Sequence, residues 1–274
     1  MTERIASLGM YDHPAQRSAN DRLWAAIAQA LRESGVEHVP HQLTRTQDVV
    51  AHWRNPDLLL GQACGYPLTV DPTLALRIVA FPVYAAPGCV GATHRSVLVA
   101  RRQDDHASLA DFRGRRAAIN DPKSNTGMNL FRATIAPVAV ATPGRGRFFG
   151  EVIETGSHRA SVIAVGTGNA DIAAIDCLSY AAIDRFEPEL TARLRIVARS
   201  PASPTLPFVT AASTDRATVD LLTAALDHAI ADVSLADACA SVFLTGIAAA
   251  AEPRLASIAA LEDYAVRVGY PHLH

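Results

Sequence analysis

Strand and helix patterns alternate along this 274-residue chain, and the alternation limits the folds it can adopt. Residues 4–10 have strand character, and residues 21–34 have helical periodicity that ends at Gly35. Short apolar runs at 57–62 and 78–83 are bounded by glycine and proline, which is typical of strands buried on both faces. The order of these segments predicts an α/β fold.

The same pattern begins again in the middle of the chain. A strand is predicted at 96–101, followed by a short helix at 108–112 and a further strand at 116–119. After Pro207 the sequence turns helical, and the predicted helices there cover 218–233, 235–244 and 257–268. We therefore expect two α/β lobes, residues 1–96 with 205–274 in the first and residues 97–204 in the second. The two lobes would be joined by a hinge and enclose an interlobe ligand cleft.

Composition excludes several classes of partner. About half of the residues are apolar (49%) and the formal charge is −2, so there is no basic field for nucleic acid. No apolar run approaches the roughly 20 residues of a membrane-spanning helix, so we expect no membrane insertion. The first residues, M-T-E-R-I-A-S-L, do not form a signal peptide, which leaves a cytoplasmic location open.

The four cysteines, Cys64, Cys89, Cys177 and Cys239, show neither a C-x-x-C pair nor close histidines, so the sequence predicts no zinc site and no metal. Two interpretations stay open. The thiols are free and buried, or Cys64 and Cys89 form a disulfide in an oxidising compartment.

The segment N-D-P-K-S-N-T-G-M-N-L-F-R, residues 120–132, is the strongest functional signal. It places Ser124, Asn125 and Thr126 at the start of a predicted helix, where backbone N–H groups lack partners and carry partial positive charge. Two hydroxyls and an amide at that place favour a small oxyanion, and Gly127 permits close approach of a ligand. The alternative is an ordinary N-cap that binds nothing. The Gly-Lys-Ser/Thr order of a nucleotide phosphate loop is absent.

Two further residues stand at the starts of helices. His158, in G-S-H-R-A-S, lies in the first turn of a predicted helix, where its imidazole could donate to an anion or simply be exposed beside a capping Ser157. Asp176 ends a buried strand, where α/β proteins concentrate ligand contacts, and could receive an ammonium or hydroxyl group of a ligand. Its alternative role is to cap the helix that follows.

Polar side chains near other strand ends complete the candidate set. Tyr11 follows the first strand, Gln62 and Tyr66 follow another, and Ser96 is a weaker candidate in T-H-R-S. Each of them could line the same cleft or pack internally. His158, Ser161 and Asp176 include the residue types of a hydrolase triad, but no G-x-S-x-G motif is present, so no catalytic residue is predicted.

Several segments together resemble the phosphate/phosphite/phosphonate-type substrate-binding proteins of ABC transporters, which have the type II periplasmic binding protein fold. The matching segments are G-M-Y-D, C-G-Y-P-L, S-L-A-D-F-R-G-R-R-A-A-I-N, S-N-T-G, T-G-S-H-R-A-S, G-N-A-D-I-A-A-I-D, P-T-L-P-F-V-T and A-V-R-V-G-Y-P. They occur in the family's order across nearly the whole chain.

The resemblance implies a binding protein without cofactor that captures a small tetrahedral oxyanion and delivers it to a permease in the periplasm. The family's Ser-rich anion turn maps onto Ser124, Asn125 and Thr126, and Asn125 departs from the usual hydroxyl. Its histidine maps onto His158, and its acidic group at the far side of the pocket maps onto Asp176. Two alternatives remain, a cytoplasmic enzyme resembling pyrimidine-precursor synthases and a small-molecule sensor. The cysteine-rich stretch expected of those enzymes is not visible in the sequence. The helix-turn-helix segment expected beside the sensing part of a regulator is not visible either.

Overall fold

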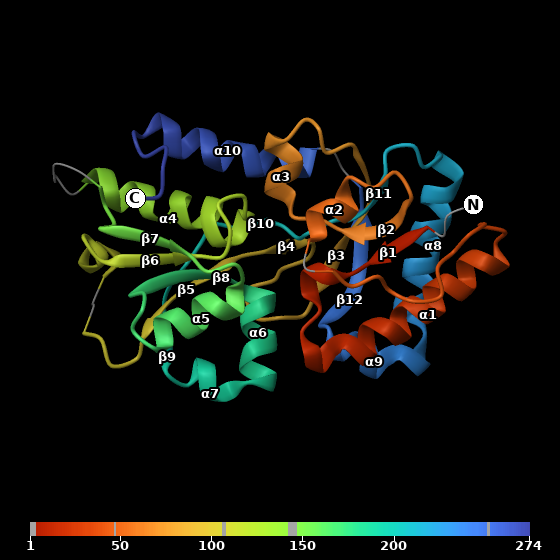
Figure 1. The fold of residues 1–274 in the computed structure, drawn as a ribbon, viewed down its shortest axis with the longest axis horizontal. Helices are drawn as coiled ribbons and strands as arrows, with labels where there is room; N and C mark the ends of the chain where they lie inside the picture. The colour runs from red at the N-terminus through yellow and green to blue at the C-terminus, as the bar shows by residue number, and fades with distance from the viewer. Residues whose placement is uncertain (1–3, 47, 106–107, 142–146, 251–252) are drawn as a thin grey trace. The chain divides into compact units, whose positions relative to one another are not determined.

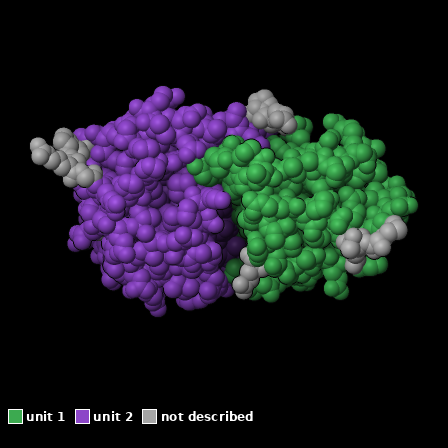
Figure 2. All heavy atoms as spheres, turned by 45° about the horizontal axis from the view of Figure 1, so that its top comes forward, with its two compact units in different colours: residues 1–85, 90–92, 204–252 green, residues 86–89, 93–203, 253–274 purple. Residues whose placement is uncertain are grey.

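A computed structural model describes residues 4–46, 48–105, 108–141, 147–250 and 253–274. The chain divides into two compact units, coloured separately in Figure 2. Unit 1 consists of residues 1–85, 90–92 and 204–252, and unit 2 of residues 86–89, 93–203 and 253–274.

Unit 1 is built on a five-stranded mixed sheet with the order β1-β2-β11-β3-β12. Its strands are β1 (Ile5–Ser7), β2 (Leu58–Gln62), β3 (Leu76–Tyr84), β11 (Phe208–Ala211) and β12 (Leu244–Ala249). β1 and β2 are parallel, whereas β11 is antiparallel to both β2 and β3, and β12 is antiparallel to β3. All residues of β2 are buried, in agreement with its apolar sequence L-L-L-G-Q.

Helices cover the sheet of unit 1 (Figure 1). They are η1 (Gly9–Tyr11), η2 (Pro14–Gln16), α1 (Arg17–Glu33), α2 (Val49–Trp53), α3 (Gly65–Val70), α8 (Arg216–Ala231), η5 (Val233–Leu235) and α9 (Ala236–Ser241). Leu23, Ile27 and Leu31 form the buried stripe of α1, which packs against α8 and α9. The helix ends before Gly35, which adopts a φ of 83°.

Unit 2 contains a second five-stranded sheet with the order β7-β6-β8-β5-β9. Its strands are β5 (Ser96–Arg101), β6 (Arg116–Ile119), β7 (Glu151–Glu154), β8 (Ile172–Asp176) and β9 (Leu194–Arg199). β6 is parallel to β7 and β8, and β5 runs antiparallel to β8 and β9. Two short strands, β4 (Thr93–His94) and β10 (Ser203–Pro204), form a separate two-stranded sheet.

The helices of unit 2 are η3 (Leu109–Phe112), η4 (Asn125–Asn129), α4 (Leu130–Ala141), α5 (His158–Gly166), α6 (Cys177–Phe186), α7 (Pro188–Thr191) and α10 (Pro253–Arg267). In the core of the unit, residues of the sheet pack with four aromatic residues, Phe112, Phe131, Phe148 and Phe149. The last helix, α10, packs on α4 (Figure 1), and Ala265 belongs to the same core.

The C-terminal segment belongs to a different unit from the one predicted, because the sequence-based assignment placed all of residues 205–274 in the first lobe. Residues 253–274 belong to unit 2, because Ala265, Tyr270 and Leu273 pack into the core of that unit. A second difference concerns the helix predicted at 235–244. Only Ala236–Ser241 is α-helical there, and the chain then forms strand β12 against β3.

None of the helices among the described residues combines the length and the apolar character needed to cross a bilayer.

Candidate functional site

The 124–127 turn connects β6 to α4. Ser124 is the N-cap, and its hydroxyl oxygen accepts a hydrogen bond from the Gly127 N–H at 3.0 Å. Its carbonyl oxygen accepts from the N–H of Asn129 at 3.0 Å, five residues ahead, so η4 is a wide π-type turn that continues into α4. Such wide turns are common at functional sites. The helix start predicted from the sequence is present, with a wider first turn than an α-helix has.

Gly127 allows two side chains to approach the turn closely. A Cβ at this position would lie 1.7 Å from Oδ1 of Asn120 and 3.2 Å from Cε1 of His158. No real Cβ tolerates the first of these distances, so glycine is required for packing here. The turn is therefore lined by the carboxamide of Asn120 and the imidazole of His158.

Thr126 connects the turn to two other candidates. Its Oγ1 lies 3.0 Å from Nε2 of His158, and its carbonyl oxygen accepts a hydrogen bond of 2.7 Å from the Ser96 hydroxyl. Ser96 starts β5, and His158 opens α5 after the N-cap Ser157, whose hydroxyl accepts from the Ala160 N–H. The structure thus brings together Ser96, Thr126 and His158, which are predicted separately from the sequence.

Asn125 is the member of the turn whose side chain has the most internal partners. Its Nδ2 donates to Oγ of Ser203 at 2.8 Å, and its Oδ1 accepts from Nδ2 of Asn129 at 3.2 Å. Only 1% of the residue is exposed. The carboxamide therefore fastens the turn to β10 and to the end of η4.

Burial lowers the pKa of His158, and the neighbouring imidazole of His94 acts in the same direction, whereas the carboxylate of Asp176 opposes the shift. The folded protein therefore favours a neutral imidazole at His158. A neutral imidazole can donate one hydrogen bond and accept another.

Asp176 is buried at the end of β8, with 2% of its surface exposed. One carboxylate oxygen accepts from the N–H groups of Leu178 and Ser179, and the other lies 3.0 Å from Nδ1 of His94. Burial acts to raise the pKa of Asp176, but the charge and hydrogen bond of His94 outweigh it and keep the pKa below its ordinary value. Asp176 thus caps α6, the alternative role that the sequence left open, and also pairs with His94.

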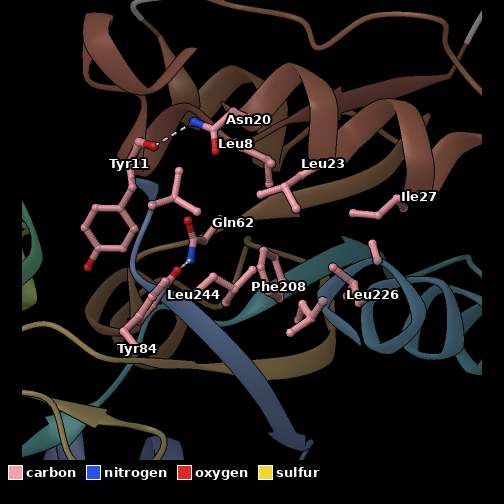
Figure 3. A pocket seen from close by; sticks show the side chains of 13 residues that line it. Leu8, Tyr11, Asn20, Leu23, Ile27, Gln62, Tyr84, Phe208, Leu226 and Leu244 are labelled. Carbon is pink, nitrogen blue, oxygen red and sulfur yellow. Dashed lines mark hydrogen bonds between the residues drawn. The ribbon is translucent and has the colours of Figure 1, made fainter. Parts of the chain in front are cut away.

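The remaining candidates lie in unit 1. Gln62 is buried at the end of β2 and donates from Nε2 to the Tyr84 hydroxyl at 2.8 Å and to the carbonyl oxygen of Leu206 at 3.1 Å. Tyr11 packs edge to face on Tyr84, with ring centroids 5.8 Å apart. Tyr66, in α3, is buried with 6% of its surface exposed. Gln62, Tyr11 and Tyr84 form the polar end of a pocket in this unit (Figure 3).

This pocket has a volume of about 40 Å³ and lies between α1, α8 and the sheet. Apolar side chains line most of it, including Leu23, Ile27, Phe208 and Leu226 (Figure 3). A pocket of this size has room for a water molecule or a small apolar group, and its mostly apolar lining is a poor environment for a charged oxyanion.

Sequence reasoning missed His94, Ser203 and Asn120. His94 stands two residues before Ser96 in T-H-R-S, but its pairing with Asp176 joins β4 to β8 and leaves no sequence pattern. Ser203 likewise reaches Asn125 across 78 residues. Asn120 directly precedes the D-P-K-S-N-T-G segment, and its position next to Gly127 is the one relation that a local motif could have indicated.

Among the described residues, no group of three or more His, Cys, Asp or Glu side chains could hold a metal ion.

Comparison with known proteins settles the family. A family profile described as "ABC transporter, phosphonate, periplasmic substrate-binding protein" matches residues 12–249. The chain belongs to this family. It is a family of transport proteins rather than enzymes, so the enzyme alternative has no support. A comparison with curated proteins gave no match.

Solved structures agree with this assignment at the level of the fold. A binding protein component of the ABC phosphonate transporter of Pseudomonas aeruginosa is 17% identical, with a TM-score of 0.75 over 97% of this chain and 88% of that chain. A Prochlorococcus marinus protein in complex with methylphosphonate is 14% identical, with a TM-score of 0.69 over 96% and 98%. A Xanthomonas citri protein bound to ATP is 16% identical, with a TM-score of 0.71 over the whole of both chains. The fold is that of the type II periplasmic binding proteins.

Proposed function

We propose that this protein binds a small tetrahedral phosphorus oxyanion of the phosphonate class at the 124–127 turn. The observation that carries the proposal is the direct contact of Thr126 with His158 beside the capped turn, in a chain of the phosphonate-binding family. The first N–H groups of a helix and short hydroxyls suit a compact anion.

The donors can be assigned one by one. The hydroxyls of Ser124 and Thr126 and the N–H groups of Asn125 and Thr126 would hold the anion oxygens, since the N–H groups of Gly127 and Asn129 already donate to Ser124. His158 would support Thr126, because an Nε2–H that donates to Oγ1 leaves the Thr126 hydroxyl proton for the anion. Asn125 would contribute its backbone, since its side chain is bonded to Ser203 and Asn129. Ser96 remains a proposed contributor of second rank, because its hydroxyl already donates to the carbonyl oxygen of Thr126. Tyr11, Gln62 and Tyr66 lie in unit 1 and stay sequence-based candidates.

The environment of Asp176 narrows the ligand further. A carboxylate that pairs with His94 and caps α6 is not poised to receive an ammonium group. We therefore favour phosphate, phosphite or methylphosphonate over aminoalkylphosphonates. The family description further supports delivery of this ligand to an ABC permease from the periplasm.

The test is isothermal titration of the full chain with methylphosphonate, phosphite, phosphate, 2-aminoethylphosphonate and sulfate. Thr126→Val should weaken binding of the best phosphorus anion at least about 10-fold, because a hydrogen bond to a charged group contributes about 1.5–3 kcal/mol. Ser124→Ala should weaken it similarly and also loosen the cap.

Thr134→Val on α4 is the matched control. It removes a hydroxyl that bonds only to the carbonyl oxygen of Leu130, so binding should stay at the wild-type level. Wild-type affinity in folded Thr126→Val and Ser124→Ala proteins would refute the assignment of the site. A ligand recovered unchanged after binding supports a carrier, whereas turnover would support an enzyme.

A further inference from the structure

Cys89 is presented by a tight turn of the sequence A-P-G-C. The Cys89 N–H donates to the carbonyl oxygen of Ala86 at 3.0 Å, and Gly88 adopts a φ of 105°. Proline at the second position and a glycine with positive φ at the third are typical of a type II turn. The turn thus defines the backbone that carries the Cys89 side chain.

Cys177 is fixed on the other side by the start of α6. It directly follows the N-cap Asp176, and its N–H donates to the carbonyl oxygen of Arg95 at 3.0 Å. A Cβ on Gly88 would lie only 3.0 Å from Cβ of Cys177, so glycine also provides the close approach of the turn to the helix. The two backbones therefore meet at a defined place.

The two sulfur atoms are in contact. Sγ of Cys89 lies 3.6 Å from Sγ of Cys177, both residues belong to unit 2, and both are free thiols. Cys177 is buried, with 1% of its surface exposed, whereas Cys89 is half-buried. The disulfide considered between Cys64 and Cys89 is not formed, and Cys177 is the sulfur neighbour of Cys89.

We propose that Cys89 and Cys177 form a disulfide bond when the protein meets a disulfide oxidant, as proteins do in the periplasm. Cys89, the more accessible thiol, loses its proton, attacks the oxidant and releases one reduced thiol. Cys177 then gives up its proton, attacks the Cys89 sulfur and releases the second. Two protein thiols become one S–S bond, and the oxidant disulfide becomes two thiols.

The order of these steps follows from the surroundings of the two sulfurs. The contact with Cys89, burial and the nearby Asp176 carboxylate all raise the pKa of the Cys177 thiol. Cys177 is therefore the poorer first nucleophile. The bond would fasten the 86–89 turn to the residue that follows Asp176, beside the His94–Asp176 pair. This inference does not depend on which anion the protein binds.

The experiment is treatment of the full, reduced chain with oxidised glutathione, followed by thiol counting after denaturation and by non-reducing peptide mapping. The chain has four cysteines, so we expect two thiols to remain and one linked peptide to join Cys89 to Cys177. The bond closes a loop of roughly 90 residues, and the midpoint of thermal unfolding should rise by roughly 5–10 °C over the reduced form.

Matched variants separate this pair from the other thiols. Cys64→Ser/Cys239→Ser should lose both of its thiols on oxidation, whereas Cys89→Ser should keep all three. Four titratable thiols in the treated wild type would overturn the proposal, as would a lasting glutathione adduct at Cys89 or a linked peptide that joins Cys64 to Cys89. Circular dichroism of each variant confirms that the thiols are measured on folded protein.

Discussion

At the scale of single residues, the missing side chain of Gly127 organises the candidate site. Asn120, which follows β6, and His158, which begins α5, occupy the space that a Cβ of residue 127 would take. The hydroxyl of Thr126 then meets the imidazole at 3.0 Å. The geometry of the site therefore depends on glycine at position 127, where a hydrogen atom takes the place of a side chain.

Gly127→Ala should lower the free energy of unfolding by about 1–3 kcal/mol, because the added methyl overlaps Oδ1 of Asn120. Urea unfolding measures the change. Gly166→Ala is the matched control, since a Cβ there meets its nearest neighbours only at 3.9–4.0 Å. Adding Asn120→Ala to Gly127→Ala should recover part of the loss. A double variant no more stable than Gly127→Ala alone would show that the overlap is not the cause.

The lowered pKa of His158 predicts a pH dependence of stability. The unfolded chain takes up a proton at His158 near the ordinary pKa of 6.5, whereas the folded protein does so only at lower pH. Protonation thus favours the unfolded state, and the stabilisation present above about pH 6.5 is lost as the pH falls through the folded pKa, by at most about 1.4 kcal/mol per pH unit.

The measurement is the difference in unfolding free energy between wild type and His158→Asn from pH 7.5 to 5. This difference should favour the wild type most at pH 7.5 and shrink as the pH falls. A difference that stays constant or grows toward acid would contradict the lowered pKa.

The sequence predicted the residues of the turn but not their individual roles. Helix starts have local signatures, so the sequence could place Ser124, Thr126 and His158 at such starts. The side-chain partners of Asn125 and Asp176 are Ser203 and His94, which are 78 and 82 residues away, so no local pattern could indicate them. For the same reason the Cys89–Cys177 contact was not foreseen.

At the scale of elements, local patterns predicted helices and strands well where one face or both faces are buried. α1 and α8 agree with their predictions to within a few residues, and β2, β3 and β5 appear where apolar runs were found. β12 was missed because Gly246 and two alanines give L-T-G-I-A-A a low strand propensity, and pairing with β3 makes it a strand. The π-type start of α4 was also missed, since it depends on the partners of Asn125 and Asn129.

Arg132 ties α4 to the C-terminal segment. It is 4% exposed, its Nη1 donates to the carbonyl oxygen of Pro271 at 2.9 Å, and its Nη2 donates to Oδ1 of Asn129 at 2.8 Å. Nη2 also lies 3.3 Å from a carboxylate oxygen of Glu262 in α10. Because Asn129 in turn bonds to Asn125, the Arg132 guanidinium stabilises the 124–127 turn through these two asparagines.

Arg132→Met should therefore cost about 2–4 kcal/mol of unfolding free energy, because it leaves buried acceptors without a donor. Arg216→Met is the control. The Arg216 side chain is 81% exposed, and its pair with Asp220 on the helix surface should contribute less than about 0.5 kcal/mol. Equal effects of the two substitutions in chemical denaturation would rule out a structural role for the Arg132 network.

At the scale of the whole molecule, neither unit is a continuous stretch of chain. The chain passes from one unit to the other after residues 85, 89, 92, 203 and 252. The sequence predicted two α/β lobes but assigned the last helix to the first, because periodicity shows which face of a helix is buried and not what covers it. The core of unit 2 includes Tyr270 and Leu273, from the other end of the sequence.

Removal of residues 253–274 should therefore damage unit 2 and spare unit 1. Hydrogen exchange followed by mass spectrometry should show protection lost in β6, β8 and α4 but kept in β2 and β3. Anion binding should be lost as well. Loss of protection in β2 and β3 instead would support the assignment of the last helix to the first lobe.

The order in which a ribosome delivers these segments has its own consequence. The sheet of unit 1 needs β12, which ends at Ala249, and the core of unit 2 needs Leu273, which is made later. The core of unit 2 can therefore be completed only after all of unit 1 has been made. We therefore expect unit 1 to be the first of the two units to complete its fold as the chain leaves the ribosome.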